Sequence, residues 1–181
     1  MIVKHRFATH AVANNTTTLI LGTFNPDNSS NIDFFYGRPR NHLWDLLPAC
    51  FGEQGLKSAS LQAKQEFMAR HKIDFVDLIK SLKDLPLDEI DNYEDVFIDK
   101  YIDEFEDVAS LIASIPSISK VCFTRSTLPA SIPRIGQRVR ELQHYCVSKQ
   151  VNFDFLITPS RFVSRAKLNN WKSKIGIYAP K

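Results

Sequence analysis

The sequence is poor in glycine and cysteine and has no long apolar run. Its 181 residues include six glycines and three cysteines, and no apolar run approaches the roughly 20 residues of a membrane-spanning helix. The cysteines Cys50, Cys122 and Cys146 lie far apart and form neither a C-x-x-C pair nor a zinc or iron–sulfur spacing. The N-terminus lacks the apolar stretch of a signal peptide. We therefore expect reduced, buried thiols in a cytoplasmic protein that contacts no membrane.

Several common catalytic and nucleotide-binding signatures are also absent. Only one glycine, Gly22, follows the first apolar run, so neither G-x-G-x-x-G nor G-K-[ST] is present there. The five histidines form no H-x-E or H-E-x-x-H pattern, and Ser126 and Ser160 lack a G-x-S-x-G context. These absences argue against a dinucleotide or triphosphate site, a zinc hydrolase and a hydrolytic triad. We expect neither a metal nor another cofactor.

The sequence does have enough apolar residues for a core, and its charge is unevenly distributed. A hydrophobic content of 44% supports one folded domain over residues 1–181. Residues 74–107 hold 13 acids against three lysines, a net charge of −10, which leaves +13 on the remainder of a chain whose net charge is +3. Residues 158–181 hold six cations and no acid. Two interpretations stay open: a face that attracts phosphate, or a solvated basic segment without a partner.

Strand-like apolar runs alternate with helix-like segments along the chain. Strands are predicted over residues 17–23, 119–126 and 152–160, while residues 73–79 fit either a strand or a short helix. Helices are predicted from about residue 41 onward, within 60–72, within 93–116 as one or two helices, within 131–151 and within 164–176. Apolar strands without alternation predict a parallel α/β sheet covered by helices on both faces. Ligands bind such sheets at the carboxyl ends of the strands.

The first strand is followed by the loop "GTFNPDN". Gly22 allows a ligand to approach the backbone closely, and Asn25 and Asn28 offer side-chain amides at the strand end. Both asparagines are also common turn residues, and on this motif alone the turn interpretation is favoured.

A second loop, "FFYGRPRNHLW", combines aromatic rings, cations and an amide. Tyr36 could stack on a nucleobase, and Arg38 and Arg40 could bind phosphate oxygens. Asn41 could hold a base edge or a water molecule, or it could cap the helix that follows. Trp44 is expected in the core.

The third loop, "ITPSRFVSRAK", places hydroxyls and cations at the end of the last predicted strand. Its hydroxyls belong to Thr158 and Ser160, and its cations are Arg161, Arg165 and Lys167. Phe162 is apolar within this basic stretch. It could enter a base stack as a wedge, or it could fold back onto the core.

Taken in order, these loops resemble three motifs of the uracil-DNA glycosylase superfamily, in particular of its mismatch-specific uracil and hypoxanthine-DNA glycosylase branches. "LILGTFNP" resembles the first motif and "LITPSRFVSRAKLNNW" the last. "YGRPRNHLW" resembles the middle segment and matches it at Tyr36, Pro39, Asn41 and Trp44. Together with the intervening strand segments, the resemblance extends over most of the chain.

The resemblance implies a three-layer α/β/α sandwich around a four-stranded parallel sheet. It also implies hydrolysis of the N-glycosidic bond of a deaminated or damaged base, uracil or hypoxanthine, flipped out of DNA. The expected partner is DNA, as a damaged or mismatched duplex or a single strand, and we expect a monomer. The implied catalytic residues are Asn41 and Asn25. The implied base-binding residues are Gly22, Thr23, Phe24, Tyr36, Thr158 and Ser160, and the implied DNA-binding residues are Arg38, Arg40, Arg161, Phe162, Arg165 and Lys167.

The chain departs from the family pattern at three positions. Phe24 stands where mismatch glycosylases have an asparagine, Thr158 stands where a histidine begins the usual last motif, and Arg38 replaces another histidine. Two other functions therefore stay open. One is a nucleic-acid-binding relative without catalysis, and the other is an enzyme that acts on a free nucleoside or another small molecule.

Overall fold

A computed structural model of the chain describes residues 1–27, 32–89, 92 and 94–176. Four strands form the main sheet in the order β3-β2-β6-β7, and each neighbouring pair is parallel. The strands are β2 (Thr18–Gly22), β3 (Ile73–Asp77), β6 (Lys120–Phe123) and β7 (Asn152–Phe155). This confirms the predicted four-stranded parallel sheet, and residues 73–77 are a strand.

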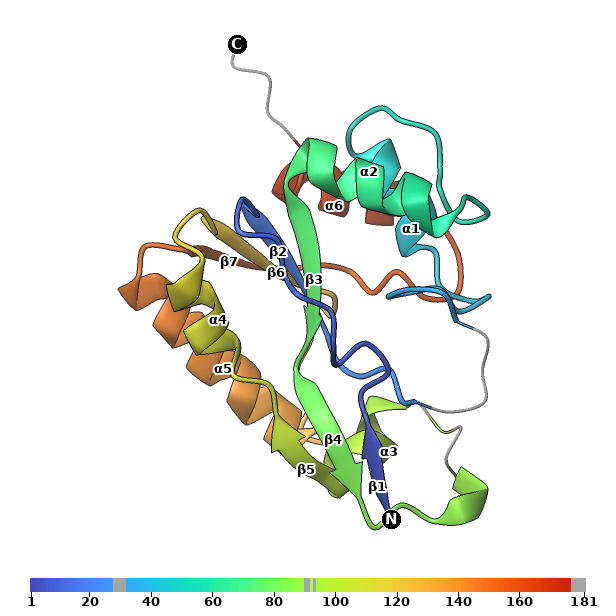
Figure 1. Cartoon of the computed structure of the whole chain (residues 1–181), viewed down its shortest axis with the longest axis vertical. Coiled ribbons are helices and arrows are strands. Elements are labelled where there is room, and N and C mark those ends of the chain that lie inside the picture. Colours follow the sequence, from blue (N-terminus) through green and yellow to red (C-terminus); the bar gives the residue numbers. More distant parts are fainter. Residues whose placement is uncertain (28–31, 90–91, 93, 177–181) are drawn as a thin grey trace.

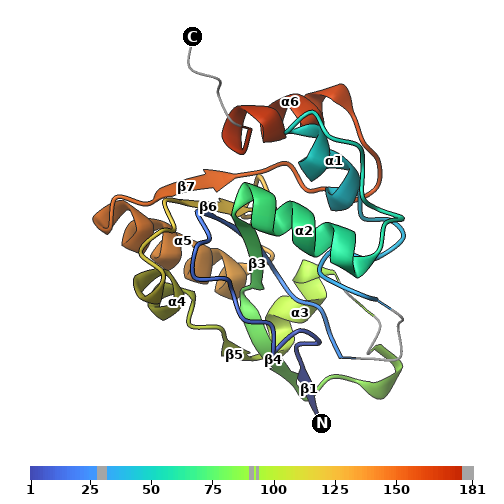
Figure 2. The same ribbon diagram turned by 45° about the horizontal axis from the view of Figure 1, so that its top comes forward.

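Helices cover both faces of this sheet (Figures 1 and 2). One layer holds α1 (Leu43–Ala49), α2 (Leu61–His71) and α6 (Arg165–Lys174), and the other holds α4 (Val108–Ser114) and α5 (Pro133–Ser148). Because successive strand residues point to opposite faces, β2 contributes to two cores. Ile20 belongs to the core that holds Trp44 and Trp171, while Leu19 and Leu21 belong to the core on the α4 and α5 side. The predicted three-layer sandwich is confirmed.

Local sequence signals account for several of the helix boundaries. The side chains of Ser60 and Ser164 accept hydrogen bonds from the first turns of α2 and α6. Pro133 begins α5, where its missing N–H costs nothing. The predicted apolar stripe of α5 is buried and consists of Ile135, Val139, Leu142 and Cys146, together with Gly136.

A second, antiparallel sheet was not predicted from the sequence. It has the order β1-β4-β5 and consists of β1 (Ile2–Lys4), β4 (Ile79–Lys83) and β5 (Ile102–Phe105). The chain enters β4 directly from β3, so the two strands form one long, bent run (Figure 1). The predicted helical stretch 93–116 contains α3 (Asp95–Tyr101) and α4 with β5 between them, and the short 3-10 helix η1 (Leu87–Glu89) precedes it. An amphipathic pattern did not reveal β5, because a four-residue strand is too short to show its own period.

All three thiols are free, and Cys122 and Cys146 are buried as expected, while Cys50 is half-buried. Among the described residues, no helix combines the length and the apolar character that crossing a membrane requires.

Candidate functional site

A cavity of about 580 Å³ opens at the carboxyl ends of the parallel strands. The chain reverses its direction of strand addition between β2 and β6, and ligands bind α/β sheets at such a point. The three predicted loops and the ends of β3 and β6 all reach the cavity. Its lining includes Thr23, Phe24, Asn25, Tyr36, Arg38, Arg40, Asn41, Asp77, Asp95, Thr124, Arg125, Thr158, Ser160 and Arg161. Most of the predicted site residues therefore line one cavity, while Gly22, Phe162, Arg165 and Lys167 do not. Asn28 lies outside the described residues.

Two of the predicted loops are joined along one wall of the cavity. Asn41 and Ser160 form an antiparallel bridge. The amide of Arg161 donates to the carbonyl oxygen of Arg40 at 2.8 Å. The amide of His42 donates to the carbonyl oxygen of Pro159 at 2.9 Å. This pairing joins residues 40–42 to residues 159–161, which lie 117 to 121 positions apart in the chain, as one wall.

Asn41 serves the helix and the cavity at once. Its Oδ1 accepts a hydrogen bond of 2.9 Å from the amide of Leu43, at the start of α1. The same side chain lines the cavity. An asparagine amide has one acceptor and two donors, so the cap leaves the Nδ2 donors for a ligand. The N-cap of α1 is His42, one residue after the predicted position, but the Asn41 side chain still accepts from the amide of the first helical residue.

Tyr36 is held in a specific orientation on the floor of the cavity. Its backbone has a φ of 58°, in the left-handed region that non-glycine residues seldom adopt. Its hydroxyl lies 3.0 Å from Thr124 Oγ1, and its ring contacts that of Phe75. Burial and the charges of Asp77 and Asp95 raise the pKa of Tyr36 well above 10, so the side chain stays a neutral phenol.

Gly22 makes room for this arrangement. A Cβ atom at Gly22 would lie 2.0 Å from Asp77 Oδ1 and 2.6 Å from the Tyr36 hydroxyl. Both groups therefore occupy the space that a larger residue would fill. The close approach is made by two side chains of the protein itself, and the predicted approach of a ligand to Gly22 stays a prediction.

Comparisons with known proteins agree with this architecture. No protein-family model matches the chain. A hypoxanthine DNA glycosylase of Methanosarcina barkeri is 39% identical over 69 residues, which are 38% of this chain and 43% of that protein. A solution NMR structure from Methanosarcina acetivorans, of a protein provisionally named a uracil DNA glycosylase, superposes with a TM-score of 0.63 over 90% of each chain at 22% identity. The predicted resemblance to the uracil-DNA glycosylase superfamily is confirmed. The sequence match spans less than half the length of the hypoxanthine DNA glycosylase, and the NMR structure establishes likeness of fold.

Within this glycosylase-like fold, the sequence did not indicate the role of Asp77. Its side chain is only 2% exposed and lies at the end of β3, opposite Gly22 in the strand pairing. Its Oδ2 accepts hydrogen bonds from His5 Nε2 at 2.8 Å and from Asn25 Nδ2 at 2.6 Å. Asn25 is thus buried in a network with Asp77. The available signal was an acid at the end of an apolar run that also holds Asp74.

A second acid that the sequence did not single out also lines the 580 Å³ cavity. Asp95, at the start of α3, is bonded to Arg125 after β6 and to the side chain of Thr23. Burial raises the pKa of Asp95, and the nearby Arg125 opposes that rise. The pair joins α3 to the main sheet. Asp95 and Arg125 are 30 residues apart in the chain, so no local sequence motif could reveal this ion pair.

The last loop presents an apolar side chain to solvent. Phe162 is 61% exposed, so the alternative that it folds back onto the core is wrong. Arg161 and Arg165 are also exposed. Lys167 is buried, and its Nζ donates to the carbonyl oxygens of Ser160 and Phe162 at 2.6 and 2.9 Å. Lys167 therefore fixes the shape of the loop, and this placement favours Arg161 and Arg165 as the groups that meet phosphate.

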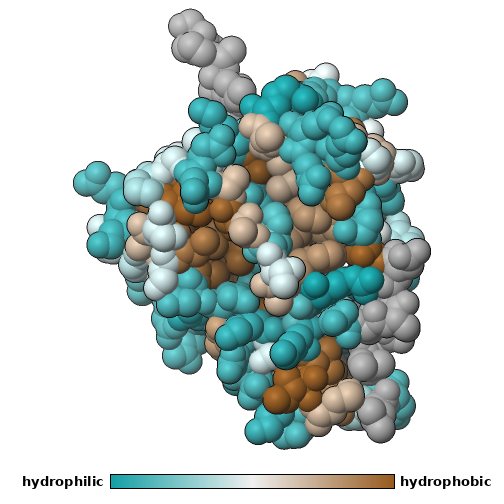
Figure 3. All heavy atoms as spheres, viewed as in Figure 1, coloured by the Kyte–Doolittle hydropathy of each residue, from teal (hydrophilic) through white to brown (hydrophobic). Residues whose placement is uncertain are grey.

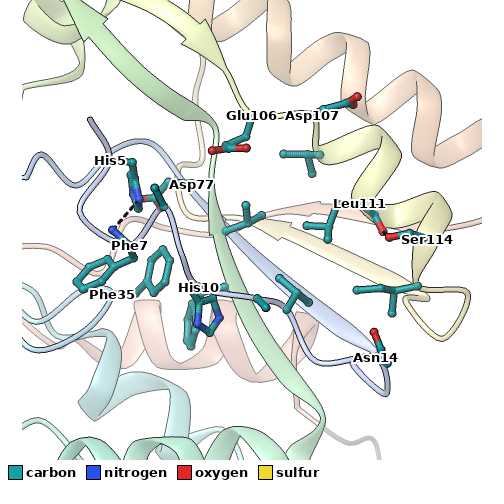
Figure 4. Close-up of a pocket in the computed structure, with 17 residues that line it drawn as sticks. His5, Phe7, His10, Asn14, Phe35, Asp77, Glu106, Asp107, Leu111 and Ser114 are labelled. Carbon is teal, nitrogen blue, oxygen red and sulfur yellow. Dashed lines mark hydrogen bonds and ion pairs between the residues drawn. The ribbon is translucent and has the colours of Figure 1, made fainter. Parts of the chain in front are cut away.

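A smaller cavity of about 300 Å³ lies on the other side of Asp77. The N-terminal segment, β3 and α4 line it, and Figure 4 shows His5 and His10 among its side chains. In Figure 3 the apolar surface between α4 and the strands forms a hollow surrounded by hydrophilic side chains. In the described part of the chain, no three His, Cys, Asp or Glu side chains are grouped so that they could hold a metal ion.

Proposed function

We propose that the protein is a DNA glycosylase that hydrolyses the N-glycosidic bond of a deaminated or damaged base flipped out of DNA. The observation that carries this proposal is the convergence of all three glycosylase-like loops on one cavity at the carboxyl ends of the sheet. The partial sequence match to a hypoxanthine DNA glycosylase supports it. Hypoxanthine and uracil are the first bases to test. We further propose that the protein acts as a monomeric single domain in the cytoplasm.

The rim of the cavity suits a flipped nucleotide. An enzyme that reaches a base inside a duplex must extrude it, at a cost of a few kcal/mol. The exposed ring of Phe162 is placed to fill the space that the base leaves. The exposed Arg161 and Arg165 on the same loop supply charge for the adjacent phosphates. Arg40 is exposed on the joined loop and adds to this cationic rim, while Arg38 lines the cavity with its Nε and Nη2 buried.

Inside the cavity, the proposed catalysis rests on positioning. Tyr36 offers a ring for stacking, and Asn41 offers its Nδ2 donors to a water molecule or to the base edge. Holding the attacking water and the glycosidic bond in register can supply several orders of magnitude in rate. Asn25 takes part through Asp77, whose carboxylate it orients.

A lesion-panel assay tests the proposal. Oligonucleotides that carry one uracil or one hypoxanthine, as duplexes and single strands, are incubated with the protein, and abasic sites are cleaved by alkali and counted. We expect release from at least one substrate, with a loss of at least a hundredfold in Asn41→Asp. That variant keeps an acceptor for the Leu43 amide and removes the Nδ2 donors, so the helix cap is preserved.

Asn170→Asp is the matched control. Asn170 Oδ1 also accepts from a backbone amide, that of Ile157 at 2.9 Å, but it does not line the cavity. We expect it to keep wild-type release. A pure, folded protein that releases neither of these bases nor any other damaged base overturns the glycosylase proposal.

The apolar Phe24 and the absence of a histidine at Thr158 favour one second candidate, a nucleic-acid-binding relative without catalysis. It predicts DNA binding that weakens with salt, and no base release. Binding of the same oligonucleotides, measured by fluorescence anisotropy at several salt concentrations, separates the two. An enzyme that acts on free nucleosides would instead be indifferent to the loss of Arg161 and Arg165.

A further inference from the structure

The tip of the last loop keeps a specific shape although it buries little of its own surface. Residues 161–163 are all exposed. Arg161 has a φ of 76°, in the left-handed region that is unfavourable for a residue with a side chain. Because burial of side chains contributes so little here, contacts to the backbone of the loop must hold Phe162 in place.

His42 binds two carbonyl groups of this loop from the side of the middle loop. Its backbone amide donates to the carbonyl oxygen of Pro159 at 2.9 Å. Its ring Nε2 lies 3.2 Å from the carbonyl oxygen of Arg161, and since a carbonyl oxygen can only accept, Nε2 is the donor. His42 is also the N-cap residue of α1, so these two bonds tie the loop to the start of a helix.

Lys167 binds the alternate carbonyl groups from the side of α6. Its Nζ donates to the carbonyl oxygens of Ser160 and Phe162 and lies 4.8 Å from the centre of the Phe162 ring. The four successive carbonyl groups of residues 159–162 are therefore divided between Lys167 and His42. His42 holds the one that belongs to the left-handed residue Arg161, directly before Phe162.

The ring of His42 is itself held in orientation. Its Nδ1 lies 3.0 Å from Asp45 Oδ2, one turn along α1, and 3.3 Å from Lys57 Nζ. Lys57 Nζ also donates to the carbonyl oxygen of Pro39 at 2.8 Å. Whichever of its two contacts Nδ1 makes, both ring nitrogens are engaged and Nε2 faces Arg161. His42 lines neither cavity, so it is placed to act through the loop and not on a bound base.

We propose that His42 is a positioning residue, which preorganises the last loop so that Phe162 can fill the gap left by a flipped base. This inference rests on the proposed glycosylase function and deepens it, since it names what holds the wedge ready before DNA binds. A loop that is ordered in advance does not have to be ordered on binding, and its affinity is higher for that reason. His42 directly follows Asn41, so the same contact keeps the wedge in register with the proposed catalytic amide.

DNA binding without chemistry tests the inference. The full chain is titrated by fluorescence anisotropy into two duplexes of one sequence, one intact and one with a tetrahydrofuran abasic analogue, which offers a gap in the base stack. We expect the wild type to prefer the abasic duplex by at least about fivefold, since Phe162 then stacks in the gap. In His42→Ala this preference should fall roughly 3- to 12-fold, the loss of one hydrogen bond.

His42→Gln is the conservative variant. The Nε2 of glutamine can still donate to the carbonyl oxygen of Arg161, so we expect this variant to keep most of the preference for the abasic duplex. His144→Ala is the matched control, because His144 is an exposed histidine of α5 that lines neither cavity. It should bind both duplexes like the wild type. A general loosening of the fold would weaken the binding of both duplexes alike, and thermal unfolding measures it independently.

Base release gives a second measurement on the same variants. A flipped base leaves a gap in a duplex and none in a single strand, so in His42→Ala the ratio of release from duplex to release from single strand should fall by the same factor as the binding preference.

The other outcomes overturn the inference or separate it from the glycosylase proposal. An unchanged preference for the abasic duplex in His42→Ala overturns it, because Lys167 would then hold the loop alone. Equal binding of the two duplexes by the wild type overturns it as well, since the loop would not act as a wedge. If His42→Gln loses as much as His42→Ala, the donor to Arg161 is not the cause. The expected binding result without release of any damaged base would overturn the glycosylase proposal and leave the role of His42 in the loop standing.

Discussion

A side chain at Gly22 would disturb the floor of the large cavity. In Gly22→Ala the new methyl group would begin 2.0 Å from Asp77 Oδ1 and 2.6 Å from the Tyr36 hydroxyl. Ordinary van der Waals contact needs at least 3.4 Å, so Asp77 or the backbone of β2 must move by more than 1 Å. Overpacking of this kind costs about 1–3 kcal/mol.

The partners of Asp77 add to that cost. If the carboxylate moves, it loses one of its hydrogen bonds to His5 or Asn25, and a hydrogen bond to a charged group contributes about 1.5–3 kcal/mol. We therefore expect Gly22→Ala to lower the free energy of unfolding by at least about 2 kcal/mol, or Tm by roughly 4–8 °C in a domain of this size.

Urea unfolding followed by circular dichroism measures this change. Gly136→Ala is the matched control, because Gly136 lies within α5 and a Cβ there would meet only the end of the Arg140 side chain at 3.4 Å. Alanine favours a helix over glycine by about 1 kcal/mol, so we expect that variant to be neutral or more stable. Equal unfolding free energies for Gly22→Ala and the wild type would refute the close approach on which the shape of the cavity depends.

Three further predictions concern the last loop and a buried thiol. Phe162→Ala should lower base release from duplex DNA roughly 5- to 150-fold, the equivalent of about 1–3 kcal/mol of lost stacking. A similar fall in base release from single-stranded DNA would contradict the role of Phe162 as a wedge in the base stack. Arg161→Ala and Arg165→Ala should each reduce the slope of log affinity against log salt by about 1, and unchanged slopes would rule out their phosphate contacts. Burial raises the pKa of Cys122 to about 12, so Cys122 in the native protein should not react with a disulfide reagent at pH 8. In the urea-unfolded protein it should react rapidly. Fast reaction of Cys122 in the native protein would contradict its burial.

The sequence was informative wherever a local pattern decided the structure. The apolar runs of β2, β6 and β7 and the helical stripe of α5 are each visible within one short segment. The parallel order follows from the alternation of these strands with helices. The three predicted loops meet at one cavity because parallel strands bring their carboxyl ends to one edge of the sheet.

The structure adds contacts between residues that are distant in sequence. Asp77 lies 72 residues from His5 and 52 from Asn25, and no spacing rule links them. The role of Lys167 was misjudged for a similar reason. Its ammonium binds carbonyl oxygens of its own loop, which composition alone cannot distinguish from a phosphate contact. The sheet β1-β4-β5 depends on a three-residue strand at the N-terminus, too short to be recognised without its partners.

The most direct test of the central claim is base release by the wild type and by Asn41→Asp, assayed side by side on the same lesion panel. The account predicts that the wild type generates abasic sites and that the variant, folded and with its helix cap intact, does so at least a hundredfold more slowly. Equal release by the two proteins would contradict the assignment of Asn41 to the reaction, and no release by the wild type would contradict the glycosylase function.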